Sequence, residues 1–161
     1  MLTMCGRGTL EQCLASAEQA VDSGTALERF AWMLQCQGGD PAVAEHPERL
    51  PQPANSLTVT ADRAGYLTRI ASEEIGLAAM ELGAGRRKAE EVLDPTAGLK
   101  LHCAVGDPVT PGMPLATLYA TGVTDFSAAA ARVRGAMPIG EAQPRVRPLL
   151  RQVIDTEGAA G

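Results

Sequence analysis

The sequence predicts an α+β protein in which a helical hairpin precedes a small domain of strands and short helices. Two observations lead to this prediction. Apolar residues recur at helical spacing up to about residue 37, and they alternate with polar residues after residue 57. A chain of 161 residues, 45% of them apolar, is long enough to bury a core. With only 3% aromatic residues, that core must be aliphatic.

Residues 1–40 are expected to form the helical hairpin, with helices of about residues 10–22 and 25–37. Gly24 separates the two helices, and a Gly-Gly-Asp-Pro stretch ends the second. Each helix opens with the spacing of a capping box, and the pairs are Thr9 with Gln12 and Thr25 with Glu28.

Each expected helix has one apolar face. The side chains on these faces are Leu10, Leu14, Ala17 and Val21 in the first helix and Leu27, Phe30, Ala31 and Leu34 in the second. A hairpin of this size has no core of its own, so we expect these faces to be partly exposed in the isolated chain. Residues 2–5 are expected to be the end of a longer helix that lies upstream.

Residues 41–56 contain four prolines and predict a stiff linker between two domains. The second domain is expected over residues 57–131, and residues 132–161 are expected to add a helix end, a strand and a tail. The expected strands are residues 57–61, 66–70, 99–105, 115–119 and 146–154. Two short helices are expected at residues 73–82, capped by Ser72 and ended by Gly83, and at residues 127–136.

Composition argues against several classes of protein. The net charge is −5 and the arginines are scattered, whereas a protein that binds a nucleic-acid backbone needs clustered positive charge. The sequence has no apolar run of about 18 residues and no signal peptide, so we expect no membrane span and a cytoplasmic location.

The four cysteines do not predict a metal site. No pair of them has the CxxC spacing, and neither His46 nor His102 lies at zinc spacing from a cysteine pair. Four buried or half-buried thiols in a reducing compartment are the simpler interpretation, and these thiols belong to Cys5, Cys13, Cys36 and Cys103.

The stretch Gly83-Ala84-Gly85-Arg86-Arg87 invites interpretation as a phosphate loop. Such a loop needs its glycines before a helix, where free N–H groups meet the anion. Here the glycines follow an expected helix, so Gly83 is better interpreted as a left-handed residue that ends it.

Other candidate catalytic groups also have simpler interpretations. His102 lies on the outward side of an alternating strand with no nucleophile motif near it, which argues against a small hydrolase. Glu73 with Glu74 and Glu90 with Glu91 are adjacent in sequence, and adjacent carboxylates on a helix do not face each other. We therefore expect these residues to be surface groups.

Residues 105–118 form a Gly-Asp, Pro-Gly and Pro-Leu pattern that is similar to the hairpin of biotinyl and lipoyl carrier domains. A carrier joins its cofactor to a lysine on the next tight turn. Here that turn, residues 121–124, has no lysine, and the only lysines are Lys88 and Lys100. A covalent carrier is therefore disfavoured, although the shared pattern suggests a barrel-sandwich shape.

A longer, ordered set of motifs resembles the C-terminal domain of the pyrimidine-nucleoside phosphorylases, the family that includes thymidine phosphorylase. The motifs are Gly65–Ile70, Ala78–Arg86, Asp94-Pro95, Gly98–His102 and Val105–Leu118. Upstream, residues 23–30 and 37–41 look like the end of that family's central domain. The chain departs from the family pattern at Cys103-Ala104, at Tyr119 and near Gly8-Thr9.

The resemblance implies a fold and an activity. Members of the family are homodimeric pentosyltransferases, a class of glycosyltransferase, that cleave the N-glycosidic bond of a pyrimidine nucleoside with phosphate. It implies that residues 1–40 are the tail of the central α/β domain and that residues 57–131 are a hammerhead with a barrel-sandwich hybrid.

The family's phosphate loop and base-binding residues lie upstream of the matched segment. The resemblance therefore places no catalytic, substrate-binding or metal-binding residue on this chain and implies no cofactor, phosphate being a co-substrate. We expect the chain alone to be an inactive scaffold whose partner is the remainder of the subunit. The alternative is a stand-alone binding module of barrel-sandwich type without a carrier lysine.

Overall fold

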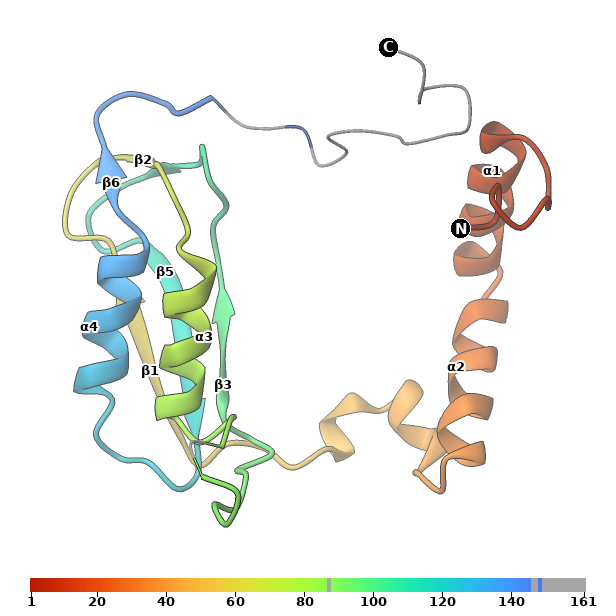
Figure 1. Ribbon diagram of the computed structural model, residues 1–161, viewed down its shortest axis with the longest axis horizontal. Coiled ribbons are helices and arrows are strands. Elements are labelled where there is room, and N and C mark those ends of the chain that lie inside the picture. Colours follow the sequence, from red (N-terminus) through yellow and green to blue (C-terminus); the bar gives the residue numbers. More distant parts are fainter. Residues whose placement is uncertain (87, 146–147, 149–161) are drawn as a thin grey trace. The chain divides into compact units, whose positions relative to one another are not determined.

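The computed structural model describes residues 1–86, 88–145 and 148, and it divides the chain into two compact units, residues 1–52 and 53–161. Figure 1 shows the elements of both units in chain order. The first unit is helical, and the second combines short strands with two helices. The protein is therefore α+β, as the sequence predicts.

The N-terminal unit, residues 1–52, is built around α1 (Leu10–Asp22) and α2 (Thr25–Cys36). The predicted capping box of α1 is confirmed. Gln12 N–H donates to Thr9 Oγ1 over 3.3 Å, and Thr9 N–H donates to Gln12 Oε1 over 3.0 Å. These two bonds satisfy donors that the first turn of a helix otherwise leaves free.

The predicted capping box of α2 is wrong. Gly24 occupies the N-cap position with φ +81°, and Thr25 is already helical, its hydroxyl donating to Ala20 O over 3.2 Å. Two residues separate the helices, so the turn needs a left-handed residue and Thr25 cannot be the extended residue of an N-cap. Residues 2–5, expected as a helix end, form hydrogen-bonded turns instead.

Part of the proline-rich segment folds within the N-terminal unit. Two 3₁₀ helices, η1 (Pro41–Ala44) and η2 (Pro47–Arg49), each begin with a proline, which suits a first helical position. Asp40 caps η1 by accepting Ala42 N–H over 3.0 Å, and it also pairs with the Arg49 guanidinium at 2.8 Å. Of the two 3₁₀ helices, η1 packs against α2, and η2 packs against η1.

The described part of the C-terminal unit contains two antiparallel sheets of three strands each, β1-β5-β3 and β4-β2-β6. Their bounds are β1 (Asn55–Thr60), β2 (Gly65–Leu67), β3 (Gly98–Leu101), β4 (Pro108–Val109), β5 (Pro114–Ala120) and β6 (Ile139–Gly140). In the first sheet β5 is central, and Leu118 lies opposite both Leu57 and Leu99. The central strand is thus bonded along both edges.

Two helices, α3 (Ser72–Glu81) and α4 (Ser127–Ala136), lie side by side against the first sheet (Figure 1). The core between them is aliphatic, as predicted. The side chains that are fully buried include Val59, Leu67, Leu118 and Val133. Phe126 is the one aromatic residue among the buried hydrophobics of the described chain.

Some boundaries differ from those expected. The strand expected at residues 66–70 ends at Leu67, and the two-residue strands β4 and β6 were not anticipated. Such short strands are too brief to show an alternating pattern. Ser72 does not cap α3, since it is already helical and Ala71 occupies the cap position. Apart from residue 148, the strand expected at residues 146–154 lies outside the described residues.

Candidate functional site

The Gly83 segment ends α3 and does not form a phosphate loop. Gly83 has φ +103° and its N–H donates to Met80 O over 3.1 Å, while Ala84 N–H donates to Ala79 O over 3.0 Å. This pair of bonds is the Schellman arrangement of a helix C-terminus. The N–H groups are used by the helix itself, and a C-terminus carries partial negative charge that repels an anion. The predicted capping role of Gly83 is confirmed.

His102 is exposed and follows β3, as predicted for a residue on the outward side. Its Nε2 forms a hydrogen bond of 2.8 Å with Thr117 Oγ1 on the neighbouring strand β5. Among the described residues, no carboxylate is recorded against the other ring nitrogen. The imidazole is therefore not oriented as a general base that activates a nucleophile would be.

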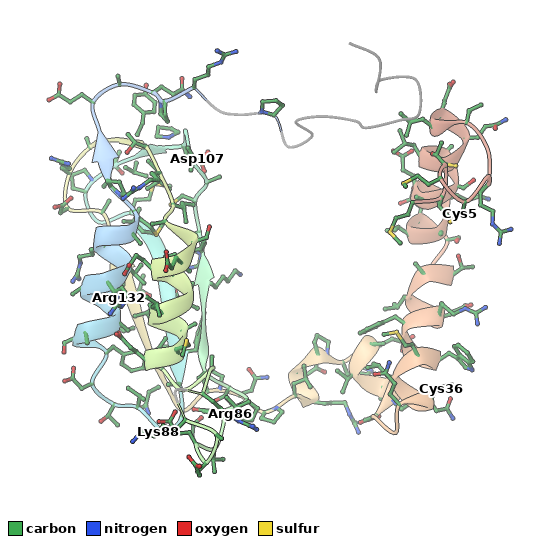
Figure 2. The ribbon with its side chains drawn as sticks, in the orientation of Figure 1. Cys5, Cys36, Arg86, Lys88, Asp107 and Arg132 are labelled. Carbon is green, nitrogen blue, oxygen red and sulfur yellow. The ribbon has the colours of Figure 1, made fainter. Side chains whose placement is uncertain are left out.

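The expected surface position is confirmed for Glu73, Glu90 and Glu91, whereas Glu74 is half-buried and pairs with an arginine. Arg132 of α4, labelled in Figure 2, contacts Glu74 and Glu81, which lie seven residues apart on α3. Its Nε and Nη2 donate to Glu81 Oε1 over 3.1 and 2.9 Å. Hydrogen bonds from Arg132 to Glu81 and then to Glu74 raise the pKa of the guanidinium. Glu73 remains exposed.

This ion network joins α3 to α4, and the sequence held little sign of it. Glu81 Oε2 is buried and has no hydrogen-bond partner among the described residues. Among the described residues, the hydrogen-bond partner of this carboxylate is Arg132, and no nucleophile bonds to it. We interpret the network as a structural tie between the two helices.

Asp94 is the centre of a second cluster of polar contacts. It belongs to the Asp94-Pro95 motif of the family, but nothing in the sequence marked it as a centre of hydrogen bonds. Its Oδ2 accepts the backbone N–H groups of Thr121 and Gly122 over 2.7 and 3.1 Å. Its Oδ1 accepts both the N–H and the hydroxyl of Thr96 over 2.9 and 2.6 Å. The Thr96 hydroxyl first, and then these N–H groups, hold the pKa of Asp94 well below its usual range.

The turn at residues 121–124, where a carrier domain would present its lysine, therefore makes internal hydrogen bonds instead. Thr121 and Gly122, where a carrier would present its lysine, bind the Asp94 carboxylate through their backbones. The two lysines, Lys88 and Lys100, lie elsewhere in the chain. The hairpin of residues 105–118 thus leads into a turn that is used for internal contacts.

The cysteines do not gather. The predicted burial is confirmed for Cys13 and Cys103 but is wrong for Cys5 and Cys36, which are exposed in the N-terminal unit (Figure 2). All four thiols are free. Burial, and then the nearby charge of Asp107, raise the pKa of the Cys103 thiol. Within the described residues there is no group of three or more potential metal ligands.

An open hollow of about 580 Å³ lies in the N-terminal unit. It lies between α2 and η1, and Leu27, Trp32 and Pro41 are among the residues that line it. Glu28 and Glu45 also line this hollow, and no described histidine, cysteine or lysine does. The hollow therefore resembles exposed surface and not an active site.

Large apolar side chains are exposed along α1 and α2. The predicted exposure is confirmed for Leu10, Leu14, Leu27 and Phe30, with exposed fractions of 66, 56, 44 and 44%, while Leu34 is half-buried. Trp32, which is 55% exposed and lies under the Arg29 guanidinium, extends this surface. We call these six residues the hairpin surface. Exposed large apolar side chains gathered on one helical hairpin favour an interaction site.

The helices of the described residues are too short or too polar to cross a membrane.

The chain is similar to known proteins over most of its length. Residues 66–140 match the profile described as "Pyrimidine nucleoside phosphorylase C-terminal domain". The pyrimidine-nucleoside phosphorylase of Bacillus subtilis (strain 168) is 45% identical over 112 residues, which are 70% of this chain and 26% of that protein. The enzyme of the same name from Staphylococcus aureus (strain bovine RF122 / ET3-1) is 43% identical over 111 residues, which are 69% of this chain and 26% of that protein.

The chain thus spans about a quarter of the length of the curated relatives it matches. The matched profile extends from Tyr66 in β2 to Gly140 in β6 and so includes α3, α4 and the central strand β5. The chain therefore carries, at residues 66–140, the C-terminal domain of the pyrimidine-nucleoside phosphorylase family, and it belongs to that family as a C-terminal portion.

Proposed function

We propose that this chain is the C-terminal part of a phosphorylase subunit that transfers a pentosyl group from a pyrimidine nucleoside to phosphate. The observation behind this proposal is the 45% identity to a pyrimidine-nucleoside phosphorylase, which covers 26% of that protein. The rest of such a subunit supplies the phosphate and base sites. The contribution of this chain is to scaffold them.

The internal contacts of the C-terminal unit support a structural role. The conspicuous charged residues of its helices and loops, Asp94 and Arg132, have all their recorded contacts within the unit. Its two small sheets and paired helices are compatible with a hammerhead that carries a barrel-sandwich hybrid, and we assign that architecture to it as part of the proposal.

The hairpin surface supports the proposed partner, the remainder of the subunit. Burying a large apolar side chain is worth roughly 1.5–3 kcal/mol, so several exposed ones favour association. Leu10, Leu14 and Trp32 are each more than half exposed. The complete enzyme is proposed to be a cytoplasmic homodimer that uses phosphate as co-substrate and needs no other cofactor.

A chimera tests the proposal. The C-terminal quarter of the Bacillus subtilis relative is replaced by the matching residues of this chain, and phosphorolysis of thymidine and uridine is followed as release of the free base. We expect the chimera to be active and this chain alone to release no base above a heat-killed control. The unmodified relative is the positive control.

Two outcomes contradict the proposal. Base release by this chain alone would mean that it has a reaction centre of its own. A chimera that folds and assembles like the unmodified relative but is inactive would mean that this chain does not serve as that enzyme's scaffold.

The alternative function, a stand-alone binding module, rests on a different observation. The core of the C-terminal unit is continuous and draws on both sheets and both helices, for example through Val59, Leu67, Ala78 and Val133. A unit with such a core can fold without a partner. An inactive but folded chimera would favour this alternative.

A further inference from the structure

Polar groups hold the point where the chain enters the C-terminal unit. Ala54 N–H donates to Thr121 Oγ1 over 3.3 Å. Asn55 Nδ2 donates to the carbonyl oxygens of Thr121 and Val123 over 3.4 and 3.3 Å. Asn55 then begins β1 opposite Ala120 of β5. Ala54 is thus anchored before the first sheet begins, and Thr121 is its anchor.

The stretch that precedes this anchor has little conformational freedom. On its N-terminal side, Leu50 N–H donates to Pro47 O over 3.1 Å and closes the last 3₁₀ turn. Residues 51–53 lie between the two anchors, and Gln52 is the only one of them that is not a proline. Proline fixes its own φ and restricts the residue before it. Gln52, which precedes a proline, is therefore restricted as well.

The hydrogen bonds made by the hydroxyl groups beside Ala54 can be donated in only one direction. A threonine hydroxyl has a single hydrogen, and an ionised carboxylate only accepts. The Thr96 hydroxyl, 2.6 Å from Asp94 Oδ1, therefore donates to Asp94. The 2.7 Å contact between the hydroxyls of Thr96 and Thr121 is then donated by Thr121. Thr121 Oγ1 is left to accept from Ala54 N–H.

These bonds form one ordered chain from the backbone at Ala54, through Thr121 and Thr96, to the carboxylate of Asp94. Its charged end strengthens it, because hydrogen bonds to ionised groups are shorter and stronger than neutral ones and polarise their neighbours. The other carboxylate oxygen of Asp94 holds Thr121 N–H at 2.7 Å, so Thr121 is fixed by its backbone and its side chain together.

We propose that Asp94, Thr96 and Thr121 form a latch that fixes where the chain enters the C-terminal unit and confines bending between the two units to residues 51–53. This inference does not depend on the proposed enzymatic role. If the latch opens, Ala54 joins the bending segment. Ala54 neither is a proline nor precedes one, so both of its backbone dihedral angles become free.

Hydrogen exchange of single backbone amides in the full chain tests the latch. Thr121→Val removes the hydroxyl but leaves the Thr121 and Gly122 amides bonded to Asp94. It should speed exchange at Ala54 by about tenfold and leave Thr121 and Gly122 unchanged. Asp94→Asn should speed exchange at Ala54 and, in addition, either at Thr96 or at both Thr121 and Gly122, because an amide nitrogen in place of Oδ1 or of Oδ2 cannot accept.

Asp125→Asn is the matched control. Asp125 is also a carboxylate that accepts a backbone amide, from Ser127 over 2.9 Å, but it lies outside the latch. It should leave exchange at Ala54 unchanged. The latch is wrong if Thr121→Val leaves Ala54 exchange unchanged, or if that variant accelerates exchange equally throughout β5. Thr121→Val decides the matter even if Asp94→Asn does not fold.

A distance measurement tests the consequence for bending. In a Cys5→Ser, Lys100→Cys background, spin labels attach to Cys36 in the first unit and to residue 100 in the second, because Cys13 and Cys103 are buried. The distribution of distances should be broader with Thr121→Val than without it, and unchanged with Asp125→Asn. Equal widths in all three proteins would mean that the latch does not limit bending.

Discussion

Gly83 and Asp94 meet at the base of the segment that connects α3 to β3. Asp94 N–H donates to Gly83 O over 3.0 Å, and a Cβ atom added to Gly83 would lie 3.3 Å from the Cβ of Asp94. The residue that ends α3 thus lies against the residue that holds the turn after β5. Two features therefore favour glycine at position 83, its positive φ and the close approach of Asp94.

Gly83→Ala should destabilise the protein by about 1 kcal/mol or more, because alanine is strained at φ +103° and crowds Asp94. Gly76→Ala is the matched control, since Gly76 lies within α3 with open space around its Cα, and there alanine should stabilise by roughly 0.5–1 kcal/mol. Urea unfolding of the three proteins measures both changes. Equal effects of the two substitutions would contradict the left-handed cap.

Phosphate should not change the melting temperature of the wild-type chain or of Gly83→Ala. The N–H groups of Gly83 and Ala84 are bonded within the helix end and are not free for an anion. A rise in melting temperature with phosphate that disappears in the variant would reinstate the phosphate loop.

Arg132→Met should destabilise the protein more than Arg134→Ala. Arg132 pairs with Glu74 and Glu81 across two helices, so its loss leaves Glu81 partly buried without its partner, whereas the Arg134 side chain is exposed. Combining Arg132→Met with Glu81→Leu should recover stability, because no unpaired charge then remains at the less exposed position 81, while Glu74, 44% exposed, is left to water. Thermal unfolding of the single and double variants provides the test. A double variant less stable than Arg132→Met alone would contradict this account.

Two of the four thiols should react quickly with a thiol reagent in the native protein. Cys5 and Cys36 are exposed, whereas Cys13 and Cys103 are 7 and 8% exposed. A Cys5→Ser, Cys36→Ser variant should therefore react slowly until denaturant is added. Fast reaction of that variant under native conditions would mean that the core around Cys13 or Cys103 opens readily.

The raised pKa of Cys103 also predicts a pH dependence. The pKa of this thiol is higher in the folded than in the unfolded state, so its contribution to the free energy of unfolding is complete below the ordinary thiol pKa of 9.0. As the pH rises from there through the folded value, the unfolded state ionises first and that contribution is lost. Stability should fall above about pH 9 less steeply in Cys103→Ala than in the wild type. Parallel curves would contradict the predicted burial of this thiol.

The isolated chain should self-associate through the hairpin surface. Replacing Leu10 and Leu14 by glutamate should shift it toward monomer, because each buried leucine is worth roughly 1.5–3 kcal/mol. Val92→Glu is the control, since Val92 is 94% exposed but lies outside the hairpin. Sedimentation velocity distinguishes the species. A monomeric wild-type chain would mean that these side chains find their partners within the chain.

Much of the local structure could be predicted from the sequence, because neighbouring residues decide it. The Thr9–Gln12 capping box, the helix at residues 127–136 and the left-handed Gly83 depend on contacts a few residues apart and were predicted correctly. The aliphatic core follows from composition. The motifs between Gly65 and Leu118 indicated the family, and the comparison with known proteins agrees.

Tertiary structure alone decided which distant groups meet. Arg132 lies 51 residues from Glu81, and Thr121 lies 27 residues from Asp94, so no periodicity along the chain links them. The two-residue turn before Thr25 decided that Thr25 does not cap a helix. The short strands β4 and β6 form because each pairs with β2, which lies between them. Local propensity selects the helices and strands, but these hydrogen bonds form only where folding brings the segments within about 3 Å.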